Sequence, residues 1–146
     1  MTGPSTTSII VEMDGGMVPL VETSGPGDQR KNRKVFWAEL KVGVAQRQGE
    51  ASWKYTCSFD GAADLGNRMV DLVERQLGWT GDSPLHGVGD GALWVAEQVE
   101  RIGGVRGAFL VDMYHLWDYL AAAAVAWSSN VAKEVKKLKN RLKKGY

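Results

Sequence analysis

The chain has 146 residues, of which 44% are hydrophobic and 24% charged, as expected of one ordinary water-soluble domain. The longest apolar run, Leu120–Trp127, is shorter than the roughly 20 residues that a membrane span needs, and residues 1–8 lack a signal-peptide pattern. We therefore expect a cytoplasmic protein. The single cysteine, Cys57, excludes an internal disulfide, and the two histidines, His86 and His115, are too few for a usual zinc cluster.

The charge is unevenly distributed along the chain. Residues 133–146 hold seven Lys and Arg against the single Glu134, so this tail carries +6, whereas residues 1–132 hold eleven basic against sixteen acidic residues and carry −5. An acidic body argues against a general nucleic-acid surface. The basic tail is either a solvated helix end or a phosphate-binding segment. Its candidate DNA contacts are Lys133, Lys136, Lys137, Lys139, Arg141, Lys143 and Lys144.

The first part of the chain predicts three strands in succession. Residues 8–13 are mostly β-branched or apolar and run into Asp-Gly-Gly, which predicts a strand that ends in a turn and resumes briefly over 17–22. A second strand is predicted over 35–46. A third is predicted over 52–59, where alternate residues form an apolar face: Trp53, Tyr55, Cys57 and Phe59.

The remainder of the chain alternates helices and strands. It predicts, in chain order, a helix over 61–77, a strand over 85–88, a helix over 93–102, a strand over 108–111, an Ala-rich helix over 114–127 and a basic helix from about residue 130. Right-handed crossovers then place the later strands beside the first. The expected fold is α/β, a five-stranded mixed sheet flanked by helices in the ribonuclease-H-like order.

Two carboxylates occupy corresponding places in this topology. Asp14 and Asp90 follow the first and fourth strands, which are expected to be parallel neighbours, and each precedes a glycine. Mg²⁺ is commonly bound by one or two carboxylates together with waters and phosphate oxygens, so the pair is a candidate metal site. The alternative is that both Asp-Gly pairs are ordinary turns.

Asp112 and His115 form an Asp-x-x-His pattern at the start of a helix, where residues three apart share a face. Asp112 is alternatively no more than the N-cap of that helix. If the fifth strand lies outside the fourth, Asp112 is two strands, roughly 10 Å, from Asp14. Direct ligation of one ion by both residues is then less natural.

Four tryptophans, Trp37, Trp53, Trp94 and Trp117, fall on predicted strand or helix faces, and we expect them to pack in the core rather than stack on bases. Cys57 lies on the apolar face of its strand, where we expect it to serve as a small hydrophobic residue rather than a nucleophile.

Four segments together resemble the catalytic core of Kra-type bacterial insertion-sequence transposases, which are related to the Mutator-like group. These segments are Val11–Leu20, Phe36–Val44, His86–Val95 and Leu110–Ala123. The resemblance implies an Asp-Asp-Glu triad on a ribonuclease-H-like fold, in which Asp14 matches the first acid and Asp90 the second. Asp112 and His115 match the family's Asp-x-x-His signature. Such cores bind two Mg²⁺ ions, for which Mn²⁺ substitutes, and cut and rejoin the DNA of transposon ends.

The sequence also departs from the family pattern. The third acid of the family lies in a Gly-Ser-Gly-x-Val-Glu context, whereas Asp118 and Glu134 are the acids after His115 here, and neither has that context. The N-terminal DNA-binding region is also missing ahead of Asp14. We therefore expect a partial catalytic core over residues 1–128, incomplete at its C-terminus, with a basic helix over 129–146. Such a core should leave apolar surface uncovered and have little strand-transfer activity alone.

Two other functions remain open. One is a non-catalytic protein that binds DNA, or interferes with a full-length transposase, through the basic tail. The other is a small nuclease in which Asp112 serves as the third acid. The expected partners are DNA, a second copy of the chain or a full-length transposase, with no membrane.

Overall fold

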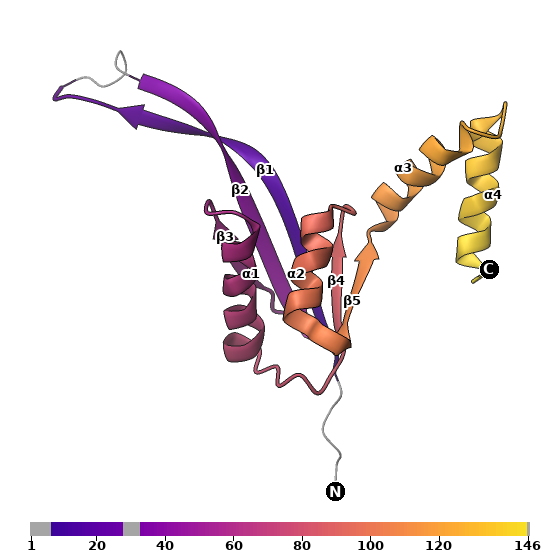
Figure 1. Cartoon of the computed structure of the whole chain (residues 1–146), viewed down its shortest axis with the longest axis horizontal. Helices are drawn as coiled ribbons and strands as arrows, with labels where there is room; N and C mark the ends of the chain where they lie inside the picture. Colours follow the sequence, from indigo (N-terminus) through magenta and orange to yellow (C-terminus); the bar gives the residue numbers. More distant parts are fainter. Residues whose placement is uncertain (1–6, 28–32, 146) are drawn as a thin grey trace, which may run out of the picture.

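The computed structural model describes residues 7–27 and 33–145. They form an α/β fold around a five-stranded mixed sheet with the strand order β3-β2-β1-β4-β5 (Figure 1). The elements, in chain order, are β1 (Ile9–Thr23), β2 (Arg33–Arg47), β3 (Lys54–Ser58), α1 (Ala62–Asp71), a π-helical turn η2 (Leu72–Gln76), β4 (Leu85–Gly89), α2 (Leu93–Gly103), a 3-10 turn η3 (Gly104–Arg106), β5 (Gly107–Val111), α3 (Met113–Ala124) and α4 (Val131–Lys143).

The pairing of the strands confirms the predicted sheet. β1 and β2 are antiparallel, and so are β2 and β3. β4 lies parallel to β1, with Ile9 opposite Leu85, and β5 lies parallel to the outer side of β4. The crossover helices therefore return each later strand to the same edge of the sheet, as right-handed connections require.

The first strand is longer than its sequence predicts. β1 does not end at Asp14 but continues through Gly15 and Gly16 to Thr23, in unbroken register with β2. β4 stops pairing with β1 at Glu12, so the next backbone N–H on that side, at Gly15, has lost its strand partner and donates to Asp14 Oδ1 over 2.7 Å. The predicted turn at Asp14 is therefore wrong, because the long antiparallel ladder overrides the local turn signal.

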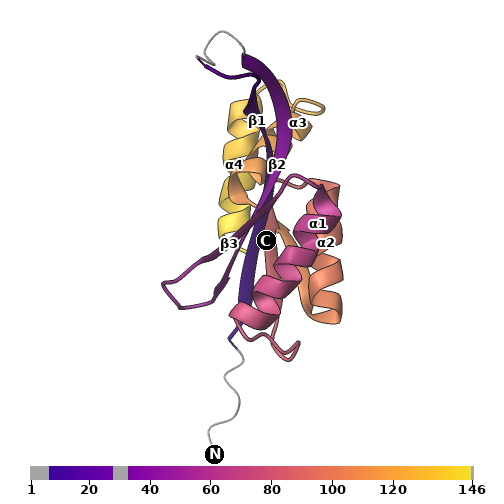
Figure 2. The same ribbon diagram turned by 90° about the vertical axis from the view of Figure 1, so that its left-hand side faces the viewer.

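Helices α1 and α2 cover one face of the sheet side by side (Figure 2). Leu65 and Met69 of α1 and Val99 of α2 pack on Val11 and Leu85 of the sheet, and all five are essentially fully buried. The predicted helix over 61–77 comprises α1 and η2, whose last turn closes with a hydrogen bond from the Leu77 N–H to the Leu72 carbonyl. This layer holds the main core.

The opposite face of the sheet keeps Val42, Tyr55 and Leu110 exposed. Helices α3 and α4 extend away from the end of β5 and pack against each other (Figure 1). The expectation of uncovered apolar surface is therefore met. No helix in the described ranges 7–27 and 33–145 is long and apolar enough to cross a membrane.

Two predictions of core packing are wrong, because Trp37 is 62% exposed and Trp53 is also exposed. Cys57, predicted to be a small hydrophobic residue on the apolar face of its strand, is exposed because that face is the one that α1 and α2 leave open. Trp94 packs against the core, and Trp117 is half-buried beside α4, under the ammonium group of Lys139.

Candidate functional site

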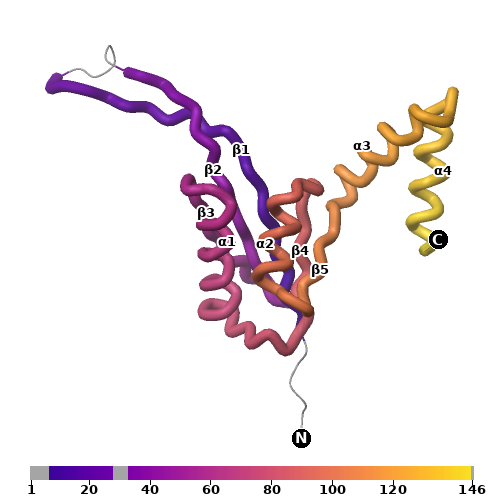
Figure 3. The backbone as a smooth tube through the Cα atoms, in the orientation of Figure 1, coloured from indigo at the N-terminus to yellow at the C-terminus, as the bar shows by residue number. Residues whose placement is uncertain are grey.

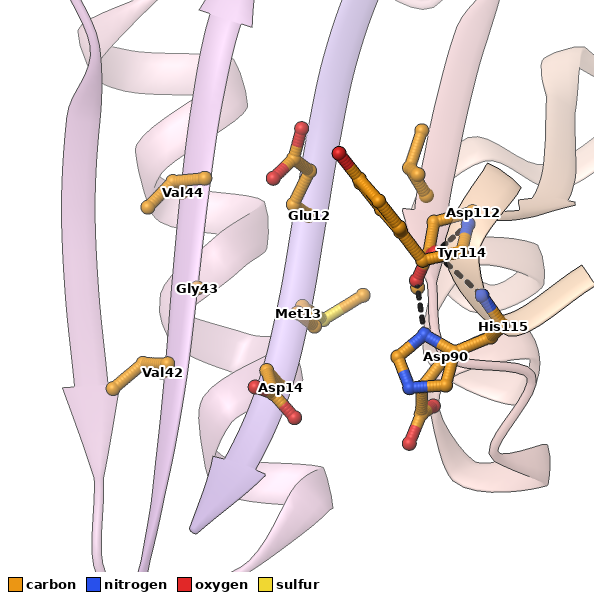
Figure 4. A pocket seen from close by; sticks show the side chains of 12 residues that line it. Glu12, Met13, Asp14, Val42, Gly43, Val44, Asp90, Asp112, Tyr114 and His115 are labelled. Atoms are coloured by element: carbon orange, nitrogen blue, oxygen red, sulfur yellow. Dashed lines mark hydrogen bonds and ion pairs between the residues drawn. The ribbon is translucent and has the colours of Figure 1, made fainter. Parts of the chain in front are cut away.

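One pocket of about 490 Å³ lies where β1, β4 and β5 meet the start of α3 (Figure 4). It brings together the four candidate site residues from the body of the chain, Asp14, Asp90, Asp112 and His115. Three elements supply the carboxylates: β1 carries Asp14, the turn after β4 carries Asp90, and Asp112 follows β5. The parallel arrangement of β1, β4 and β5 places the ends of β4 and β5 beside the middle of β1.

Asp14 projects from the face of β1 that α1 and α2 do not cover. Successive side chains of a strand point to opposite faces, so Glu12, two residues before Asp14, projects from the same face. Glu12 also lines the pocket. Both residues are exposed, so both carboxylates are in contact with water. The pocket wall along β1 is therefore acidic.

Asp90 is held in place by two hydrogen bonds. Its Oδ1 accepts the N–H of Ala92 over 2.8 Å, and its backbone carbonyl accepts the hydroxyl of Tyr119, from α3, over 3.0 Å. Gly91 has φ +97°, and a Cβ there would lie 2.9 Å from the Tyr119 hydroxyl oxygen. This turn therefore requires glycine, both for its backbone conformation and for the close approach of Tyr119.

Asp112 caps α3 and also holds His115. Its Oδ1 accepts the backbone N–H groups of Tyr114 and His115, over 2.9 and 3.0 Å, and its Oδ2 lies 2.5 Å from His115 Nδ1. The N-cap interpretation of Asp112 is thus confirmed. Because both of its oxygens are engaged within α3, the geometry does not favour Asp112 as a third metal-binding acid.

The contact between Asp112 and His115 shifts both pKa values. Hydrogen bonds from the backbone N–H and then the imidazole of His115 lower the pKa of Asp112, because they stabilise the ionised carboxylate. The hydrogen bond to Asp112 raises the pKa of His115, with smaller contributions from the negative charges of Asp112, Asp90 and Asp118.

We expect the imidazole of His115 to titrate above its ordinary value of 6.5 in the folded protein. Since the pKa of His115 is raised on folding, its protonated ring stabilises the folded protein. This contribution is fully present when the pH is below the ordinary pKa, and it is lost as the pH rises through the pKa of the folded state. The ionised carboxylate of Asp112 also stabilises the folded protein, and this contribution is lost as the pH falls through its lowered pKa. Titration of the imidazole by NMR measures the first shift directly.

Two variants identify the partner of His115 in that titration. Asp112→Asn should return the pKa of His115 most of the way to 6.5, because it removes the largest cause of the shift. Asp118→Asn should change it less, since that carboxylate acts only through its charge. An equal effect of the two variants would contradict the hydrogen-bonded pair.

Sequence reasoning missed two features of the pocket. Glu12 could have been found from its spacing of two from Asp14 on a strand, since such residues share a face. Tyr119 had no comparable signal, because its contact with Asp90 depends on the direction in which α3 leaves the sheet. Asp118 and Glu134, the acids that follow His115, do not line the pocket. Glu134 instead forms an ion pair on α4, with its Oε1 3.3 Å from Lys137 Nζ.

Basic residues form a second, separate surface on α4. Lys133, Lys136, Lys137, Asn140, Arg141 and Lys144 line a shallow groove. Lys139 lies elsewhere, with its ammonium 3.9 Å from the centre of the Trp117 ring on α3. The structure thus separates Lys139 from most of the predicted DNA-binding residues.

Comparisons of the chain with protein-family models, with curated proteins and with solved structures found no match.

Proposed function

We propose that this chain is a partial core of a DDE-type transposase with a ribonuclease-H-like fold, which uses Mg²⁺ to cleave and transfer DNA strands. The observation that carries the proposal is that Asp14 and Asp90, from neighbouring parallel strands, line one pocket. These are the two residues that the resemblance to Kra-type transposases assigns to the first two acids of the triad. The antiparallel meander followed by two parallel strands also agrees with such a core.

The donor set fits Mg²⁺ better than a transition metal. Asp14 and Asp90 offer only carboxylate oxygens, which hard cations prefer, and Mg²⁺ commonly keeps several waters and substrate oxygens in its coordination shell. In the ranges 7–27 and 33–145, no three His, Cys, Asp or Glu side chains gather closely enough to hold a metal. The proposed ion would therefore have two protein ligands, Asp14 and Asp90.

Asp14 and Asp90 would then hold a divalent ion at this pocket, since carboxylates alone would repel a phosphodiester. A bound divalent ion would supply Lewis-acid polarisation of the phosphate and activation of the attacking oxygen. Ala92 and Tyr119 hold the turn that carries Asp90, so this carboxylate keeps its position without reorganisation. His115, oriented by Asp112, presents a protonatable ring at the edge of the same pocket.

We expect low activity from this chain by itself, because Asp118 and Glu134, the acids that follow His115, do not line the pocket. Asp112 does line it, but both of its oxygens are already engaged by Tyr114 and His115. Loss of one metal ligand removes much of the transition-state stabilisation in a two-metal reaction. Metal binding, rather than strand transfer, is therefore the sharper test.

The test is a titration of the full chain with Mn²⁺. Binding is measured as the loss of the electron paramagnetic resonance signal of the free ion. Asp14→Asn and Asp90→Asn should each weaken Mn²⁺ binding at least about tenfold, since even outer-shell changes have effects of that size. Asp60→Asn is the matched control, because Asp60 is an exposed carboxylate outside the pocket. Unchanged binding in both pocket variants would refute the metal site.

A second candidate function is DNA or partner binding by the basic groove of α4. The observation that favours it is the gathering of five cationic side chains along that groove, far from the acidic pocket in the sequence and on a different helix. This function requires no metal and no catalysis, so it would survive a failure of the Mn²⁺ titration.

A further inference from the structure

The long β1–β2 hairpin continues well beyond the rest of the sheet as a two-stranded ribbon, which we call the arm (Figure 3). The arm comprises residues 16–23 of β1 and residues 33–40 of β2. β4 pairs with β1 only as far as Glu12, and β3 pairs with β2 only from Lys41 onward. Both outer edges of the arm are therefore without a strand partner in the described part of the chain.

The arm also exposes large apolar side chains on both faces. Met17, Val35 and Trp37 lie on one face and are 57%, 61% and 62% exposed. Phe36, on the other face, is also exposed. An isolated two-stranded ribbon is only marginally stable in water. A strand edge without charged residues, such as residues 35–38 of β2, can pair with a strand of another chain. The arm thus has the properties of an interaction surface.

The register shows which backbone groups the arm offers. The N–H of Ile9 donates to the carbonyl of Pro84, on the β4 side of β1. The β1–β2 register is unbroken from Ile9 to Thr23, so every odd-numbered residue of β1 has its nitrogen on the side away from β2. Pro19 is one of these residues, and it places a nitrogen without a hydrogen at the free edge of β1. Pro19 therefore blocks that edge.

The free edge of β2 has no such block. Trp37 lies opposite Pro19, so its N–H and carbonyl also point away from the ladder. The same holds at every second residue: Arg33, Val35, Trp37 and Glu39. Four consecutive donor and acceptor pairs are thus presented along one edge, and their side chains all lie on one face of the arm.

We propose that this edge of β2 pairs antiparallel with the same edge of a second copy of the chain, about a two-fold axis at Phe36. This register places Arg33 opposite Glu39 of the second copy, and the two-fold axis also places Glu39 opposite Arg33 of the second copy. It also places Val35 opposite Trp37, and Phe36 opposite its own counterpart. The outward N–H and carbonyl groups meet in this register, because the odd-numbered residues, whose backbone groups point outward, lie opposite odd-numbered residues of the second copy.

Charge complementarity favours a second copy over a nucleic acid. The segment is basic at Arg33 and Lys34, uncharged from Val35 to Ala38 and acidic at Glu39, so its basic end faces its acidic end when a second copy is reversed against it. A phosphate backbone along this edge would meet Arg33 and Lys34 favourably, but it would also meet four uncharged residues and the carboxylate of Glu39, whereas a second copy places Arg33 opposite Glu39. Lys41 lies 2.7 Å from Glu39 Oε1, and the second carboxylate oxygen can accept from Arg33 of the other copy.

The test measures the dimer dissociation constant of the full chain by analytical ultracentrifugation. Arg33→Glu and Glu39→Arg should each weaken association at least tenfold, because each places like charges opposite each other. An equimolar mixture of the two variants should restore it, since both cross-copy pairs then become opposite in charge. Lys34→Glu is the matched control, because residue 34 would face Ala38 and lie on the other face of the arm.

A fourth variant tests the backbone pairing without changing a charge. Val35→Pro removes an outward N–H and leaves the β1 ladder intact, so it should also weaken the dimer at least tenfold while the circular dichroism spectrum is unchanged. A wild-type chain that stays monomeric up to its solubility limit would overturn the proposal. So would a dimer that is insensitive to Arg33→Glu and Val35→Pro, or a monomeric chain in which these variants weaken only DNA binding.

Discussion

Replacing Gly87 with alanine is expected to lower the free energy of unfolding by roughly 3 kcal/mol, at the upper end of the usual cost of overpacking a core. A Cβ at this position would lie 2.1 Å from Val99 Cγ2 and 2.7 Å from Val99 Cγ1. Val99 is β-branched and belongs to α2, so neither a rotamer change nor a small shift relieves the clash. Chemical denaturation followed by tryptophan fluorescence measures the loss.

Two further variants separate overpacking from other causes. Gly16→Ala should leave stability unchanged or raise it by up to about 1 kcal/mol, because no atom lies within 4 Å of the added Cβ. Adding Val99→Ala to Gly87→Ala should cost less than the sum of the two single changes, since each relieves the other. Strict additivity would show that α2 and β4 do not meet at this point.

The order of the strands in the sheet could be predicted from local sequence patterns. The helical spacing of α1 and α2 and the short strands β4 and β5 depend on local periodicity, and right-handed connections then leave few arrangements of the sheet. The meeting of Asp14 and Asp90 at one pocket follows from that topology alone. It did not require knowledge of a single side-chain contact.

What periodicity could not predict is which face of a strand is covered. The alternation in β3 correctly predicts a strand, yet α1 packs over the polar face of β3, where Ser58 is buried. The Ser58 hydroxyl donates to Asp64 Oδ2 over 2.6 Å and accepts the N–H of Asp60, so its burial leaves no unpaired polar group. Cys57 and Tyr55 are left exposed as a result.

The arm was missed for a different reason. Asp14-Gly15-Gly16 has the composition of a turn, and a single local signal cannot show that fifteen consecutive residues find partners on β2. The exposed Trp37 follows from the same error, since a tryptophan on a strand was expected to face a core that the arm does not have. Long-range pairing, not propensity, decides both features.

The other large effect is expected in the DNA binding that is proposed for the basic groove of α4. Replacing Lys136, Lys137 and Arg141 of the basic groove with glutamine should lower the affinity for duplex DNA and flatten its salt dependence. Each phosphate contact that is lost reduces the slope of log affinity against log salt by about 0.9, because one fewer counterion is released. Fluorescence anisotropy with a labelled duplex at several salt concentrations measures both quantities.

Lys139→Gln is the control for this experiment, because it removes one positive charge from the same helix. Its ammonium lies over the Trp117 ring and outside the groove, so the slope should stay close to that of the unchanged chain. A slope change for Lys139→Gln that is about one third of the change for the triple variant would show that the tail acts through its total charge rather than through this groove. An unaltered slope in the triple variant would assign DNA binding to another surface, and with it would end the case for α4 as the DNA contact of this protein.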